Sequence, residues 1–330
     1  MNRSLRLLAF LVGVGILALL VEEVGLTVLL DGARQVGWLA FPIVALHGVV
    51  YALNAAAWWI TMRDEAGAPP FRTVFRISLV GFAINFLTPV VNAGGEPYRI
   101  AALAPWLGNR RASGCVLQYA MLHALSSLLM WLTAVATALT LPGIPAALRL
   151  ALVGLAIAII AALAVVRSGH RHGFVLRLSA WIARRRLGRL STWLTRREEA
   201  FASVDAQLTT IHNEHPGRLA LAVTVDYLSR WVAMGEVLLV AQGIGLALGV
   251  TAAVMISGLS ALAVNLFFLL PWEMGSREGS LYLLFGLAGV PASLGLVAAV
   301  MTRAREIVWC AVGLALAGPG GRSAARKATT

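Results

Sequence analysis

Long apolar stretches, separated by short polar turns, follow one another along almost the whole chain and restrict its possible folds more than any other feature. Apolar residues make up 59% of the 330 residues and charged residues only 13%, whereas soluble domains carry about 25% charged residues. A soluble chain of this length could not bury so much apolar surface in one core, so much of it must face lipid. Because a helix needs about 20 residues to cross a bilayer, there is room for about seven or eight transmembrane helices. The sequence therefore predicts an all-α, polytopic membrane protein.

Most of the apolar stretches have the length of a membrane helix. The predicted long helices cover Leu7–Val21, Trp38–Met62, Phe75–Thr88, Ser113–Leu141, Ala146–Val166, Leu219–Gln242, Ala247–Leu270 and Leu294–Leu316. Two further stretches, Ile100–Leu107 and Gly279–Leu287, are too short to span a bilayer. The segment from Glu22 to Arg34 is predicted to be a loop on the outer side. We expect a single integral membrane domain over residues 1–330.

Arginine supplies nearly all of the positive charge, and its distribution predicts the orientation of the chain. There are 27 Lys and Arg against 15 Asp and Glu, a net charge of +12, and Lys327 is the only lysine. Because cytoplasmic loops are enriched in Arg and Lys, both termini and residues 167–217 are predicted to be cytoplasmic. There is no soluble basic domain that would bind nucleic acid. Cys115 and Cys310 lie in or beside apolar stretches, which predicts neither a disulfide nor a zinc site.

Two polar interruptions of the apolar pattern resemble each other. Each has an Asn near the end of an apolar helix, then Pro, Gly and Glu, then a short apolar helix. The first contains Asn85, Pro89, Gly94, Gly95, Glu96 and Arg99, and the second contains Asn265, Pro271, Gly275, Arg277 and Glu278. The repeats cover about residues 72–166 and about residues 247–317, and counting crossings predicts that they are inverted in topology, each with a re-entrant short helix.

Broken helices inside a membrane are tolerated only where the irregular chain is buried or lines a polar cavity. Ser276 is predicted to be the N-cap of the second short helix. Helix N-termini close to Arg99 and Arg277 suit an anionic headgroup, especially phosphate. The alternative is that Glu96–Arg99 and Arg277–Glu278 only neutralise each other as structural pairs. The presence of two similar motifs favours a functional site.

The last predicted helix carries charges near its middle, where burial is costly. Arg303 and Glu306 lie three residues apart and can pair, which leaves Arg305 in need of an anion. That anion could be Glu278, Glu273 or a lipid phosphate. Arg303 and Arg305 therefore join the residues of the two motifs in the predicted substrate-binding site.

Other polar residues inside the predicted spans have simpler interpretations. Asp226 and Arg230 lie four residues apart and are expected to pair within their helix. His123 is expected to make a hydrogen bond in the core rather than to carry protons. The chain has neither a cluster of metal ligands nor a phosphate-binding P-loop, so no metal and no cofactor is expected.

Residues 167–217 combine arginines with apolar residues at helical spacing. This pattern predicts one or two interfacial helices on an anionic cytoplasmic leaflet. The predicted membrane-surface residues are Arg177, Trp181, Arg184, Arg185, Arg186, Arg189 and Trp193. The alternative is a solvated loop whose arginines only set the topology, and the tryptophans argue against it.

The two motifs make the chain resemble the flippase-like family named after the transmembrane region of lysylphosphatidylglycerol synthases. Asn85, Pro89, Gly95, Glu96 and Arg99 match its first motif, and Pro271, Gly275 and Glu278 match its second. The resemblance covers about Trp38 to Leu316. It implies a protein of the bacterial cytoplasmic (inner) membrane that moves amphiphilic lipids between leaflets: phospholipids, aminoacyl-phospholipids, polyprenyl-linked or hopanoid-type lipids. The synthase members carry a further soluble domain, which is not found after Leu316, so we expect transport and no catalytic residues.

Two alternatives to transport remain open from the sequence. The first is an integral membrane enzyme acting on a lipid phosphate, with Glu96 or Glu278 as general base. The second is a non-transporting scaffold that recruits a separate lipid-synthesis enzyme through its basic segment. A scaffold needs no polar residues inside the membrane, so the two motifs count against it.

Overall fold

The computed structural model describes residues 22, 26–87, 94–142, 144–172, 216–267, 273 and 275–317. Within these ranges all regular secondary structure is helical. Several predictions lie outside the described residues: the helix Leu7–Val21, Pro89, Pro271, the cytoplasmic C-terminal residues 318–330 and the membrane-surface set from Arg177 to Trp193.

The helices follow the predicted apolar stretches, except that the helix beginning at Ala146 continues past its predicted end at Val166 to His172, into the segment predicted to lie at the cytoplasmic surface. They are α2 (Leu26–Val36), the 3₁₀ turn η1 (Gly37–Leu39), α3 (Ala40–Met62), α4 (Phe71–Leu87), α5 (Gly95–Leu139), α6 (Ala146–His172), α10 (Pro216–Gly243), α11 (Val250–Leu266), α12 (Ser276–Leu287) and α13 (Ser293–Leu316). The prediction of a loop up to Arg34 is wrong, because the chain is helical from Leu26. The two charged side chains of α2, Asp31 and Arg34, form an exposed ion pair at a distance of 3.2 Å.

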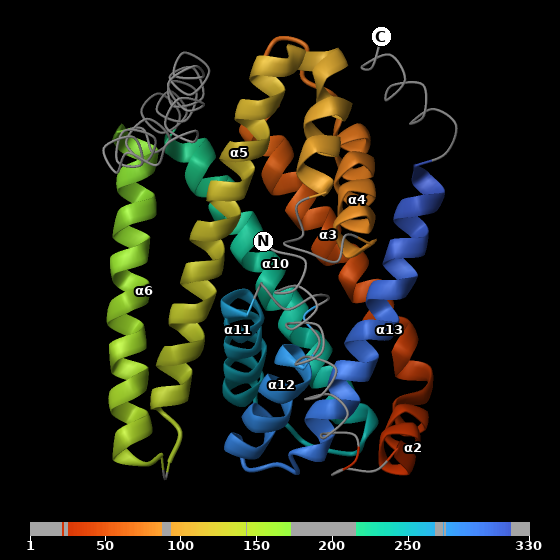
Figure 1. Ribbon diagram of the computed structural model, residues 1–330, viewed down its shortest axis with the longest axis vertical. Helices are drawn as coiled ribbons and strands as arrows, with labels where there is room; N and C mark the ends of the chain where they lie inside the picture. The colour runs from red at the N-terminus through yellow and green to blue at the C-terminus, as the bar shows by residue number, and fades with distance from the viewer. Residues whose placement is uncertain are drawn as a thin grey trace, which may run out of the picture.

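Helix α10 is the centre of the bundle (Figure 1). It packs against α3, α5, α11 and α13, while α13 also contacts α4 and α12. Helix α6 stands at one edge and packs on α5. Two apolar clusters hold the helices together, one around Phe285 and one around Trp58, and both of these side chains are fully buried.

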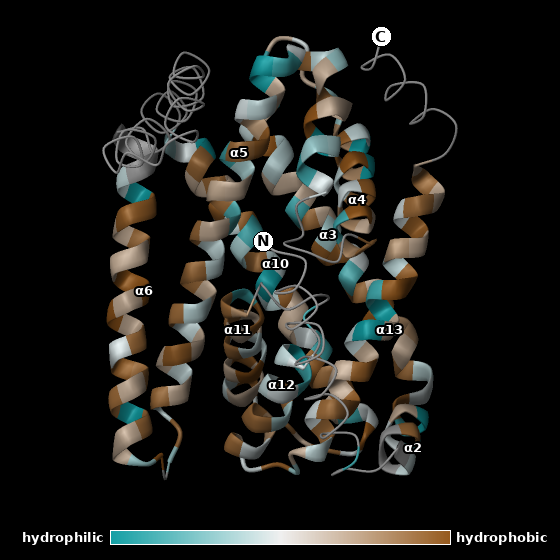
Figure 2. Cartoon of the chain, in the orientation of Figure 1, coloured by the Kyte–Doolittle hydropathy of each residue, from teal (hydrophilic) through white to brown (hydrophobic). Residues whose placement is uncertain are grey.

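The outer surface of the bundle is strongly apolar. Figure 2 shows brown, hydrophobic residues along the length of α6, where Leu150 is 73% exposed and Ile157 is 63% exposed. Leu30–Met62, Gly95–Leu139 and Ala146–Ser168 are long and apolar enough to cross a membrane. Because such a surface is stable in lipid and not in water, the chain is a multi-pass membrane protein.

Helix α5 is interrupted where the sequence predicts a boundary between a short helix and a long span. Its backbone leaves the helical region at Gly108, with φ 76° and ψ 155°. The part before this break corresponds to Ile100–Leu107, and the part after it to Ser113–Leu141. In the second half, α11 has 17 residues and α12 has 12. Both are shorter than the approximately 20 residues that a full crossing requires.

Helices α12 and α13 approach each other closely at Gly295. A Cβ atom at this position would lie 2.4 Å from the carbonyl carbon and oxygen of Leu281, so Gly295→Ala must push the two backbones apart. Overpacking of this kind costs about 1–3 kcal/mol. We expect a lower midpoint of thermal unfolding in detergent. Gly154→Ala on α6 is the matched control, because a Cβ atom there meets nothing within 4 Å; an equal effect of both variants would contradict the close packing at Gly295.

Candidate functional site

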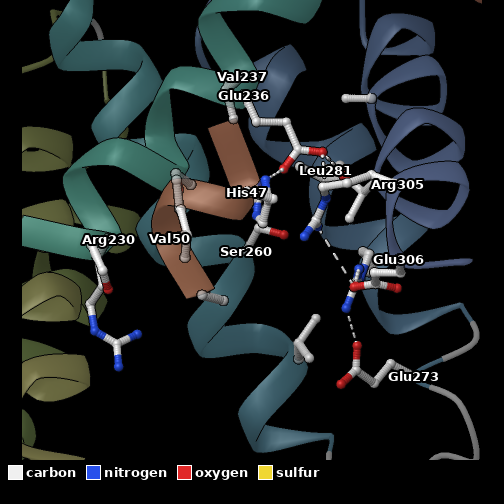
Figure 3. Close-up of a pocket in the computed structure, with 18 of the residues that line it drawn as sticks. His47, Val50, Arg230, Glu236, Val237, Ser260, Glu273, Leu281, Arg305 and Glu306 are labelled. Carbon is white, nitrogen blue, oxygen red and sulfur yellow. Dashed lines mark hydrogen bonds and ion pairs between the residues drawn. The ribbon is translucent and has the colours of Figure 1, made fainter. Parts of the chain in front are cut away.

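A polar cavity of about 410 Å³ lies inside the bundle, lined by residues of α3, α4, α5, α10, α11, α12 and α13 (Figure 3). Its charged lining residues are Arg230, Arg277, Arg305, Glu236, Glu273 and Glu306. His47 and His123 also line it. Because isolated charges are expensive inside an apolar bundle, this concentration of opposite charges identifies the cavity as the candidate site.

Two helices present a polar stripe to the cavity. On α3, His47, Tyr51 and Asn54 are spaced four and three residues apart, so they share one helix face, and all three line the cavity. On α10, Arg230 and Glu236 line it. The remaining faces of both helices are largely apolar, which directs these polar side chains inward.

The guanidinium of Arg277 is the most completely paired charge in the site. It donates one hydrogen bond to Glu306 on α13 and another to Glu273, which precedes α12. The Arg277 side chain is only 13% exposed. Arg277 therefore links the start of α12 to the middle of α13, and it lines the cavity as it does so.

Arg305 lies beside Arg277 but is paired more loosely. Its Nε is 3.3 Å from Glu236 Oε1, and its Nη2 is 3.8 Å from Glu306 Oε1. The buried Nε has no hydrogen-bond partner. The prediction that Glu278 or Glu273 would neutralise Arg305 is wrong for the described residues. The partners come from α10 and from the next residue of α13.

Glu278 has a different function at the start of α12. One of its carboxylate oxygens accepts the Gly275 N–H at 2.8 Å, and the other is 3.4 Å from Arg303 Nε. Arg303 also lies 3.6 Å from Glu306, which confirms the predicted i, i+3 pair. The predicted N-cap Ser276 is wrong, because the N-cap is Gly275 and the Ser276 hydroxyl donates to the Glu273 carbonyl.

A second buried ion cluster lies on the same helix as Glu236, two to three turns before it. Asp226 is completely buried and lies 3.4 Å from Arg230, which confirms the predicted pairing within α10. It also accepts a hydrogen bond from Ser126 and lies 3.1 Å from His123 Nδ1. The predicted hydrogen bond of His123 is present, but the prediction that it lies in the core is wrong, because the His123 side chain is 43% exposed and lines the cavity. Figure 3 shows Arg230 well apart from Arg305 and Glu236.

The first sequence motif forms a cluster of its own. The Asn85 side chain accepts the Gly95 N–H at 2.6 Å, so it satisfies the first turn of α5, whose N-cap is Gly94. Arg99 pairs with Glu96 at 2.6 Å and lies over the Trp58 ring at 5.9 Å. None of these residues is among those that line the cavity.

The structure therefore divides the predicted substrate site. Asn265, Arg277 and Arg305 line the cavity, whereas Gly275, Glu278 and Arg303 contact one another and are not among its lining residues. Asn85, Gly94, Gly95, Glu96 and Arg99 lie in the separate cluster. We expected both motifs to face one cavity, but none of the described residues of the first motif lines it.

Sequence reasoning missed His47 and did not include Glu236 or Glu306 in the site. A signal for His47 was present, because a histidine and an asparagine seven residues apart in an otherwise apolar span form a polar stripe. The contact of Glu236 with Arg305 could not be read from spacing, since the two residues belong to helices far apart in the sequence.

The arrangement can hold a charged group of either sign. The guanidinium groups of Arg277 and Arg305 suit phosphate oxygens, and the three carboxylates suit an amine. A family model described as the lysylphosphatidylglycerol synthase TM region matches residues 6–313 of the chain. Neither the curated proteins nor the solved structures contain a match.

Proposed function

Because this chain belongs to the family of lysylphosphatidylglycerol synthase transmembrane regions, we propose that it moves an amphiphilic lipid between the leaflets of a membrane. The lipid carries an anionic or zwitterionic headgroup with a phosphate, as in phospholipids, aminoacyl-phospholipids or polyprenyl-linked lipids. The protein acts as a flippase-like transporter and not as an enzyme. The headgroup passes through the polar cavity while the acyl chains stay in lipid.

The observation that carries the proposal is Arg305. Its side chain is 8% exposed, it lines the cavity between the helices, and its Nε has no hydrogen-bond partner. A buried donor without a partner is costly, so an acceptor arriving at this position gains a hydrogen bond and an opposite charge together. A phosphate oxygen is such an acceptor.

The carboxylates give the site a second property. Glu306 and Glu273 hold Arg277, and Glu236 and Glu306 lie next to Arg305. Because they compete with the phosphate for the same guanidinium groups, they limit how tightly the headgroup is held. A transporter needs such a limit, since its substrate must leave as well as enter.

The arrangement of the broken helices supports the same proposal. Helix α4 lies in the upper half of Figure 1, and α11 and α12 lie in the lower half. We assign α4 with the first part of α5, and α11 with α12, to two re-entrant pairs that enter from opposite sides. Their relation is that of an inverted repeat, which places a substrate site between the halves.

The proposed topology has both termini and residues 167–217 in the cytoplasm of a bacterial cell, with the basic segment on the anionic inner leaflet.

Cysteine labelling tests this topology. Single cysteines replace Arg34, Ala146 or Asn109, all exposed, in a protein from which the buried Cys115 and Cys310 have been removed. An impermeant maleimide added to intact cells should label the first two and not Asn109→Cys. Labelling of Asn109→Cys alone would reverse the orientation and exclude this topology.

Lipid binding tests the proposal directly. Native mass spectrometry of the purified protein should detect a co-purifying phosphate-containing lipid. The Arg305→Gln protein should retain less of it, because the neutral glutamine side chain lacks the charge that binds phosphate. Arg149→Gln, which changes an exposed arginine at the start of α6, is the control. Equal lipid occupancy of all three proteins would remove Arg305 from the headgroup site.

A further inference from the structure

Glu236 is a buried carboxylate with two possible cationic partners. It is 7% exposed and accepts a hydrogen bond from Thr302 Oγ1 at 3.0 Å. Arg305 Nε lies 3.3 Å from one of its oxygens and His47 Nδ1 lies 3.6 Å from the other. Figure 3 shows Glu236 between these two side chains. One partner carries a permanent charge, and the other can gain a charge by binding a proton.

His47 lies in position to bind a proton but makes no hydrogen bond with its Nδ1. The residue is 6% exposed, and this nitrogen has no hydrogen-bond partner in the structure. The distance of 3.6 Å to Glu236 is too long for a hydrogen bond and short enough to become one after a small movement. Both residues line the cavity, so water that enters it can deliver a proton.

The four charges around Glu236 cancel one another before any ligand enters, so the cluster that includes Glu236 carries one net negative charge. Helix α13 presents Arg305 and Glu306, α12 presents Arg277, Glu273 precedes it, and α3 adds the phenol of Tyr51. Arg277 is held by Glu273 and Glu306. Arg305 is therefore the only permanent cation within ion-pair distance of Glu236 among the described residues.

We propose that His47 and Glu236 form a proton-binding site, which takes up one proton when an anionic headgroup engages Arg305. This proposal rests on the proposed function, since it requires that Arg305 bind the headgroup. The phosphate draws the guanidinium away from Glu236, and the buried carboxylate then lacks a counter-charge. One proton from cavity water returns the cluster to the net charge it had before the headgroup bound, either on His47, which becomes the new cationic partner, or on Glu236 itself. The anionic headgroup and the proton enter together.

The second carboxylate of α10 provides an internal comparison. Asp226 also contacts a histidine and an arginine, His123 and Arg230, and it accepts a hydrogen bond from Ser126. Its partners are held in place, because Arg230 also donates to the Ser126 hydroxyl at 3.2 Å and to the His123 carbonyl at 3.1 Å. Arg230 lies apart from Arg305 (Figure 3). Binding at Arg305 therefore leaves the Asp226 cluster unchanged.

Proton uptake makes headgroup binding dependent on pH. When one proton is taken up with each ligand, the affinity rises about tenfold for each unit by which the pH falls. The same linkage lets a proton gradient drive the lipid, since each anionic headgroup is accompanied by one proton. A lipid that binds without a proton would show no such slope.

Calorimetry on the full-length protein in detergent tests the proposal, with dihexanoyl phosphatidylglycerol as the probe. Titrations in two buffers with different heats of ionisation give the number of protons taken up at each pH. We expect one proton per lipid bound by the wild-type protein. Uptake with this lipid alone would assign the site to a lipid headgroup, and equal uptake with inorganic phosphate would assign it to phosphate in general. Either result supports the proposal.

Variants place the proton. Glu236→Gln should bind the lipid with no net proton uptake and no pH slope, while the control Glu65→Gln, which changes an exposed carboxylate outside the cavity, should keep both. Loss of uptake in His47→Gln as well would place the proton on the imidazole, and retained uptake in that variant would place it on Glu236. Wild-type protein that binds the lipid without proton uptake would overturn the proposal and leave the proposed function intact. Unchanged proton uptake by Glu236→Gln would do the same. Wild-type protein that binds no lipid at any pH would instead overturn the proposed function and this inference with it.

Discussion

Replacing Arg305 by alanine should slow lipid translocation in proteoliposomes by about one to two orders of magnitude. The expected size follows from the loss of one charge-assisted hydrogen bond, worth about 1.5–3 kcal/mol, where each 1.4 kcal/mol corresponds to about a tenfold change in rate. The protein should still insert and purify, because Arg277 and the packing of α13 against α4 and α12 remain in place.

Two further variants make this prediction specific. Arg305→Lys keeps the charge but loses the planar fork that matches a phosphate, so its rate should fall between those of the wild type and Arg305→Ala. Arg149→Ala removes an exposed arginine outside the cavity and should translocate lipid at the wild-type rate. If Arg305→Ala also translocates at the wild-type rate, Arg305 is a structural residue and the headgroup binds elsewhere.

Replacing Arg277 by alanine should cause the largest loss of stability in the site. Arg277 is the shared partner of Glu273 and Glu306, and its removal leaves two carboxylates close together inside the bundle. Breaking a buried ion pair by removing one partner costs about 3–5 kcal/mol. We expect a clearly lower midpoint when unfolding in detergent is followed by tryptophan fluorescence.

The cause of that loss can be separated from a loss of packing volume. The variant Arg277→Met, Glu273→Gln, Glu306→Gln removes all three charges together and keeps similar side-chain volumes. Because replacing a buried ion cluster by neutral residues is often tolerated, this variant should recover most of the stability of the wild type. A triple variant as unstable as Arg277→Ala would show that packing, and not the loss of the shared cationic partner, determines the effect.

Much of the fold is readable from the sequence, because the length of an apolar stretch directly reflects the thickness of a bilayer. Helices α3, α10 and α13 begin and end within three residues of their predicted positions. Helix α2 was missed for a physical reason. It has only 11 residues, and its charged pair Asp31–Arg34 suggests a solvent loop, although the same spacing suits one face of a helix.

The site is less predictable than the fold. The second sequence motif selects Arg277, and the charges within the last apolar stretch select Arg305; both of these residues line the cavity. The spacing of residues within a motif does not predict which helices pack against one another. The partner of Arg305 is Glu236, about 70 residues earlier in the chain, and Arg99 stays with Glu96 and Trp58 in a separate cluster. Such contacts depend on how α10 packs against α3 and α13.

Translocation by the wild-type protein in proteoliposomes is the most direct test of the central claim. The purified protein is reconstituted with a fluorescent, headgroup-intact phosphatidylglycerol, and an impermeant quencher reports how much probe reaches the outer leaflet with time. We predict faster transfer than in protein-free vesicles and in vesicles that contain Arg305→Ala. Equal transfer in all three, with the protein shown to be inserted and folded, would contradict the assignment of this cavity to lipid transport.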